Sequence, residues 1–147
     1  MSKWINTTND LEKLCGELEC LEAVALDTEF IRTDTFYPKL ALIQISDGQG
    51  CWLIDVLSVS CYKSLKFLLE NPRQTVIFHC CLEDIEVLEY SLNICPTNIF
   101  DTQLAAGIVN IGFSMGYARL LETLTEVRLQ KQETRSNWLA RPLNSDQ

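Results

Sequence analysis

The sequence lacks the long apolar runs and the excess of positive charge that mark several classes of protein. No apolar run approaches the roughly 18–20 residues that are needed to cross a bilayer. The opening residues lack a basic stretch followed by an apolar core, so we expect no secretory signal. The chain has 12 Lys and Arg against 20 Asp and Glu, and its formal charge of −8 disfavours nucleic-acid binding through the overall field. We therefore expect a cytoplasmic protein with no membrane partner.

Cysteine is present, but not in the spacing that zinc sites or disulfide frameworks use. The seven cysteines form an odd set without paired C-x-x-C spacing, and Cys80 and Cys81 are adjacent. We predict reduced and mostly buried thiols. Apolar residues make up 47% and charged residues 22% of 147 residues, which suits one folded domain with a real core.

One apolar stretch, residues 23–30, reads as a strand with two carboxylates near its end. Because side chains on a strand alternate between faces, Asp27 and Glu29 project from the same face and Thr28 from the other. Two acids on one face of a mostly buried strand are costly unless a cation neutralises them, and a divalent metal is the usual cation. The alternative is an edge strand whose acids face water.

The apolar periodicity predicts an α/β domain with a mixed five-stranded sheet flanked by helices. Short turns between the first three strands imply an antiparallel meander, and the later strands are expected to run parallel. Trp4 and Ile5 are compatible with a further short edge strand. Thr8 or Asn9 is expected to cap the first helix and Ser114 the last. The expected strands are 23–30, 40–46, 51–55, 75–79 and 99–101, and the helices lie near 11–21, 65–69, 82–92, 102–109 and 114–124.

Asp84 is expected in the first turn of the helix that follows the strand at 75–79. That strand is short, apolar and without alternation, so we predict that it is buried on both faces beside the strand of Asp27. Asp84 then overhangs Asp27 and Glu29, and three converging carboxylates are what two hard cations need. The alternative is a first-turn acid favoured by the helix dipole.

Three further residues bear on the site. His79, the only histidine, ends the strand at 75–79, where α/β sites gather, although a structural hydrogen bond is the alternative. Phe30 lies beside the acids and could stack on a terminal base, or it belongs to the core. Asp101 is expected to be an N-cap.

Taken together, the motifs resemble the ribonuclease D family over essentially the whole chain. The resemblance implies a ribonuclease-H-like fold and the DEDD superfamily of metal-dependent 3′→5′ exonucleases. These enzymes release nucleoside monophosphates from RNA 3′ ends, notably those of transfer RNA precursors. The matching stretches are Val24–Phe30, Phe36–Leu40, Leu42–Ile45, Leu53–Asp55, Phe78–Leu88, Phe100–Ala106, Gly116–Tyr117 and Trp138–Leu143.

The resemblance implies roles for individual residues. Asp27 and Glu29 match the first-motif metal ligands and Asp84 the second-motif acid, with Mg²⁺ or Mn²⁺ as the cofactor in two sites. We add Thr28, Phe30 and His79 as predicted substrate contacts. The implied partner is the single-stranded 3′ end of tRNA-like precursors.

The family's third motif, a Tyr-x-x-x-Asp, would follow Gln147. We therefore expect the exonuclease domain at 1–147 to lack one metal ligand and the tyrosine that orients water. One metal site is then expected to be lost, and activity to be weak or absent. The second hypothesis is a catalytically impaired short form that acts as a nucleic-acid- or protein-binding module.

Overall fold

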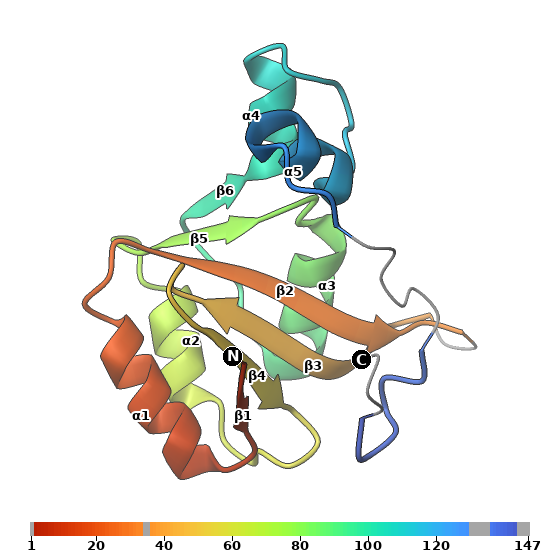
Figure 1. Cartoon of the computed structure of the whole chain (residues 1–147). Helices are drawn as coiled ribbons and strands as arrows, with labels where there is room; N and C mark the ends of the chain where they lie inside the picture. Colours follow the sequence, from red (N-terminus) through yellow and green to blue (C-terminus); the bar gives the residue numbers. More distant parts are fainter. Residues whose placement is uncertain (1, 34–35, 130–135, 144–147) are drawn as a thin grey trace.

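A six-stranded sheet in the order β1-β4-β3-β2-β5-β6 forms the centre of the molecule (Figure 1). The computed structural model describes residues 2–33, 36–129 and 136–143. The strands are β1 Lys3–Ile5, β2 Ala23–Ile31, β3 Lys39–Ser46, β4 Cys51–Asp55, β5 Thr75–Phe78 and β6 Ile99–Asp101. The helices are α1 Thr8–Leu18, α2 Lys63–Leu69, α3 Leu82–Leu92, α4 Thr102–Ile108 and α5 Tyr117–Thr125.

The sheet combines the two kinds of strand pairing that the sequence predicts. Strands β2, β3 and β4 form an antiparallel meander, β5 pairs with β2 in parallel, and β6 pairs with β5 in parallel. The turn between β3 and β4 is closed by Asp47, whose carboxylate accepts the N–H groups of Gln49 and Gly50. The α/β class is confirmed, but the count of five strands is wrong. The three residues of β1 pair in parallel with β4 and make a sixth strand at that edge.

One face of the sheet is covered by α1, α2 and α3, and the main core lies between them (Figure 1). Val24 and Leu26 of β2 point to this face because they alternate with the acids. The hydroxyl of Thr7, just before α1, accepts the N–H of Asp10, so Thr7 and not Thr8 or Asn9 is the N-cap. The largest fully buried side chains of this core are Phe78, Leu11, Leu18, Ile43, Ile45, Ile54, Leu65, Leu68, Leu69, Leu88 and Ile94.

The opposite face is only partly covered. Residues 136–143 pack over β3 and β4, where Trp138 buries itself against Ala41 and Leu42. Helices α4 and α5 stand beyond β6 at the end of the sheet (Figure 1). Between these two covers the face is open at β2, and the functional residues lie there.

Several boundaries and burial patterns differ from the sequence predictions. Strand β5 is not buried on both faces, because Val76 and Phe78 are buried while Ile77 is partly exposed on the open face of the sheet. Leu82, an apolar residue of the expected helix at 82–92, is exposed, whereas Val87 and Leu88 pack into the core.

Helix α5 starts later than the sequence suggests. Ser114 lies in a left-handed conformation with φ of 49°, and the helix begins at Tyr117 with Gly116 as its N-cap. The cysteines are all free, but the prediction that they are mostly buried is wrong. Only Cys15 and Cys81 are buried. No helix in the described part of the chain has the length and apolar character of a membrane span.

Candidate active site

The open face of β2 carries the two acids that the sequence places on one side of the strand. Asp27 lies across from Gln44 of β3, and Glu29 lies across from Leu42. The Gln44 amide approaches Glu29 with 3.4 Å between Nε2 and Oε1. Leu42 is in turn paired with Asp55 of β4, so Glu29, Leu42 and Asp55 form one cross-strand row.

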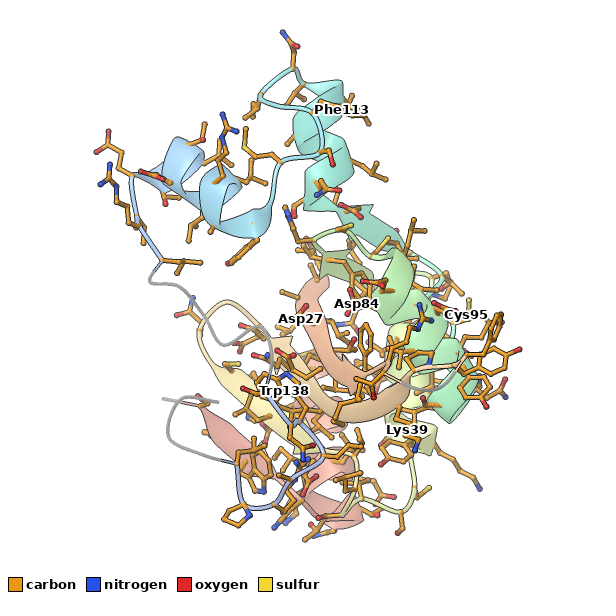
Figure 2. The ribbon with its side chains drawn as sticks, turned by 90° about the vertical axis from the view of Figure 1, so that its right-hand side faces the viewer. Asp27, Lys39, Asp84, Cys95, Phe113 and Trp138 are labelled. Atoms are coloured by element: carbon orange, nitrogen blue, oxygen red, sulfur yellow. The ribbon has the colours of Figure 1, made fainter. Side chains whose placement is uncertain are left out.

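Asp84 meets β2 at the point where β5 no longer pairs with it. Strand β5 pairs with residues 23–25 of β2, and the chain then leaves the sheet and continues into α3. The backbone of Thr28 on this edge of β2 therefore does not pair with β5. Oδ1 of Asp84 accepts both the backbone N–H of Thr28, at 3.0 Å, and its hydroxyl, at 2.6 Å. Both residues are buried. Figure 2 shows Asp27 of β2 and Asp84 of α3 near one another.

Burial and mutual repulsion disturb the titration of these acids. Burial, reinforced by the charges of Asp27 and Asp84, raises the pKa of Glu29 to about 7. Burial and the charge of Asp27 raise the pKa of Asp84 to about 6, against the opposing hydrogen bonds from Thr28. The pKa of Asp27 is also raised, chiefly by desolvation, although its side chain is accessible from the open face. The charge of Asp27 thus raises the pKa of both other acids, and such a group of carboxylates favours a cation.

The donor set fits a hard divalent cation, since carboxylate oxygens are the ligands that Mg²⁺ and Mn²⁺ prefer. Both bonds to Asp84 use Oδ1, and no residue in the described ranges bonds its Oδ2, which is left for a cation. Within those ranges, however, no three His, Cys, Asp or Glu side chains are arranged to hold an ion. Asp27, Glu29 and Asp84 therefore interact electrostatically, but they do not form a complete metal coordination shell.

A cavity of about 490 Å³ lies over the acids on the open face. This volume falls within the range of small-molecule sites. The polar residues that line it include Asp27, Glu29, Gln44, Ser46, His79 and Thr102, and the ring of Tyr117 closes part of it. The cavity therefore joins both β2 acids to residues from the ends of β5 and β6.

Of the three predicted substrate contacts, His79 lines the cavity with the acids, whereas Thr28 and Phe30 lie outside it. His79 lines the cavity together with Asp27. The hydroxyl of Thr28 is directed to Asp84. Phe30 is half-buried and packs against the main core. Neither Thr28 nor Phe30 lines the cavity, and their contact with substrate stays a prediction.

Sequence reasoning predicted Asp101 as an N-cap, and the structure confirms it. The Asp101 carboxylate accepts the N–H groups of Gln103 at 2.8 Å and Leu104 at 3.2 Å. It also accepts those of Cys80 and Cys81, which lead into α3. Burial alone would raise the pKa of Asp101, but these bonds outweigh it and lower the pKa to about 2. Asp101 thereby fixes the start of α3, and with it Asp84, to the start of α4.

Gln44, Thr102 and Tyr117 were missed as cavity residues. A lone glutamine inside the apolar run of β3 was the available signal for Gln44, because it shares the face of the acids. Thr102 and Tyr117 lie in the matching stretches Phe100–Ala106 and Gly116–Tyr117, but these stretches did not assign them to the cavity, which they reach through the packing of α4 and α5.

Comparison with known families shows which class of nuclease domain this fold belongs to. A family model described as 3′-5′ exonuclease matches residues 2–147, and the chain belongs to that family. Within it, the resemblance to ribonuclease D is confirmed. Ribonuclease D of Pseudomonas paraeruginosa is 43% identical over 145 residues, which cover 99% of this chain and 39% of the relative.

Solved structures show the same likeness. The crystal structure of Escherichia coli RNase D, described as an exoribonuclease involved in structured RNA processing, matches with a TM-score of 0.93 and 39% identity. The match covers 99% of this chain and 39% of that one. Trypanosoma brucei RNase D in complex with RNA U12 shares the fold, with a TM-score of 0.85 and 22% identity over 98% of this chain and 55% of that one. The chain thus spans about two fifths of the length of the bacterial relatives.

Proposed function

We propose that this chain carries a metal-dependent 3′→5′ exoribonuclease site that hydrolyses RNA 3′ ends to nucleoside monophosphates. The observation that carries the proposal is the coupling of Asp27, Glu29 and Asp84, two of which line the cavity. Trimming of tRNA-like precursors in the cytoplasm is the substrate class and location that the resemblance supports. RNA as the partner is supported by the complex of the trypanosome relative with RNA U12.

In this proposal Asp27, Glu29 and Asp84 hold Mg²⁺ or Mn²⁺. Bound cations would supply charge neutralisation for the phosphodiester and activation of water, the chemistry of a two-metal site. The chain's own residues prepare that site. Thr28 fixes one oxygen of Asp84 and leaves the other free, and Gln44 approaches the Glu29 carboxylate. The cavity above them accepts the terminal nucleotide.

The test combines metal binding with cleavage. The chain is titrated with Mg²⁺ or Mn²⁺ by calorimetry and then incubated with a single-stranded RNA whose 5′ end is labelled. We expect metal binding, and any single-nucleotide laddering, to disappear in Asp27→Ala. Glu89→Gln is the matched control, because Glu89 is an exposed acid on α3 outside the cavity. Metal binding that survives in Asp27→Ala would contradict the proposal.

The binding-module alternative makes a different prediction in the same experiment. It requires tight RNA binding without metal and without laddering. The net charge of −8 opposes such binding. Without metal, the three acids of the site also repel the phosphates of RNA.

A further inference from the structure

His79 has one ring nitrogen in a hydrogen bond and the other in none. Its Nδ1 lies 2.9 Å from Oγ1 of Thr102. Its Nε2 is buried and has no hydrogen-bond partner within the described part of the chain. Buried polar atoms without a partner are rare in folded proteins, and at the wall of a cavity they indicate a missing ligand.

The direction of the Thr102 hydroxyl fixes the position of the proton on His79. The hydroxyl of Thr102 donates its single hydrogen to the carbonyl of Phe78, at 2.9 Å. Its oxygen can therefore only accept from His79, so Nδ1 must carry a proton. In the neutral ring Nε2 is then an acceptor. The group that His79 lacks is a hydrogen-bond donor.

Tyr117 lies against the imidazole of His79 at the wall of the cavity. Its ring lies edge-on to the imidazole, with 5.5 Å between the ring centroids. Tyr117 is the first residue of α5, a helix of which only Leu120 is buried, and the Tyr117 side chain itself is exposed. A helix held by so few buried contacts can give way to a ligand at the cavity wall.

We infer that Nε2 of His79 accepts a hydrogen bond from a sugar hydroxyl of the terminal nucleotide, after the ring of Tyr117 moves aside. This inference rests on the proposed function, which places a nucleotide in the cavity. Phosphate oxygens are acceptors and cannot pair with the lone pair on Nε2, whereas ribose hydroxyls donate. The 2′-hydroxyl is the donor that RNA has and DNA lacks. His79 is then a specificity residue of the site.

The proton position is tested directly by NMR. His79 is the only histidine, so a long-range ¹H–¹⁵N correlation spectrum of the ¹⁵N-labelled chain contains one imidazole. At about pH 8, where an ordinary imidazole is neutral, we expect the proton on Nδ1 in the wild-type chain. Thr102→Val should release this preference, because it removes the oxygen that accepts from Nδ1. A proton on Nε2 in the wild-type chain would overturn the inference.

The ligand is tested by calorimetry in the presence of Mg²⁺, with AMP, 2′-deoxy-AMP and 3′-deoxy-AMP as probes. We expect one deoxy analogue to bind about tenfold more weakly than AMP, as the loss of one hydrogen bond implies. The weaker analogue identifies the hydroxyl. His79→Phe, checked for folding by circular dichroism, should bind all three alike. Equal binding of the three probes to the wild-type chain would overturn the inference even where Asp27→Ala abolishes AMP binding. AMP binding that survives in Asp27→Ala would instead contradict the proposed function.

Discussion

Arg141 and Asp55 are 86 residues apart in the sequence, yet 2.6 Å separates Nη2 of the guanidinium from Oδ1 of the carboxylate. Nε of Arg141 also donates to the same oxygen, and Nη2 donates to the carbonyl of Ala41. Burial alone would raise the pKa of Asp55, but the bonds from Arg141 and Ser58 lower it. This contact fastens the segment 136–143, including Trp138, to the open face beside the acids.

Arg141→Ala should destabilise the chain strongly, because it leaves the carboxylate of Asp55 buried without a cation. Removing one partner of a buried ion pair costs about 3 kcal/mol or more. Urea denaturation followed by circular dichroism measures the change. Arg128→Ala is the control, since the pair of Arg128 with Glu122 is exposed and such pairs contribute about 1 kcal/mol or less. Equal effects of the two variants would contradict this account of Arg141.

Thr28→Val should weaken the binding of Mg²⁺ without unfolding the chain. Valine keeps the shape of threonine but removes the hydroxyl that donates to Asp84 at 2.6 Å. Loss of such a supporting contact typically lowers metal affinity about 10- to 100-fold. Calorimetric titration measures the affinity. Thr28→Ser, which retains the hydroxyl, should behave like the wild-type chain, and an equal loss in both variants would contradict the role given to the hydroxyl.

Without metal, the chain should lose stability as the pH rises from about 4.5 to about 7. The pKa of Glu29 is raised from 4.5 to about 7, so the folded state binds more protons than the unfolded state across this window. Stability falls with pH wherever that holds. Glu29→Gln removes the titrating group and should stabilise the metal-free chain at about pH 8 by roughly 1–2 kcal/mol, after allowance for solvent screening. Thermal unfolding at several pH values provides the measurement, and a destabilised Glu29→Gln chain at alkaline pH would refute the prediction.

Asp101→Ala should destabilise the region between β5 and α4. The variant removes the carboxylate that accepts N–H groups from Cys81, Gln103 and Leu104, and loss of an N-cap alone costs about 1 kcal/mol. With the bonds to the start of α3 we expect about 2–3 kcal/mol in urea denaturation. Asp101→Asn keeps an acceptor oxygen and should lose less. Because the pKa of Asp101 is about 2, the wild-type contribution should persist above about pH 4 and disappear as the pH falls through about 2.

The sequence was sufficient for the elements that depend on periodicity and local chemistry. The alternation in residues 23–31 placed Asp27 and Glu29 on one face, and the position of Asp84 in a first helical turn was correct. The sequence offered Trp4 and Ile5 as a short edge strand but left it out of the five counted strands, because so short a segment has no periodicity and its place depends on pairing with β4. The hydrogen bond between His79 and Thr102 was equally out of reach, since it requires β5 and β6 to be neighbours.

The cross-strand row of Glu29, Leu42 and Asp55 has a consequence for how the sheet responds to salt. Its two acids lie on either side of Leu42 on one face. Arg141 neutralises Asp55 from within the chain, whereas no Lys or Arg among the described residues forms an ion pair with Glu29. Divalent cations in solution can therefore bind at Glu29. At Asp55 the charge is already neutralised by Arg141, so monovalent salt has little charge to screen there. Along this row, the dependence on counter-ions is therefore expected at its β2 end, at Glu29.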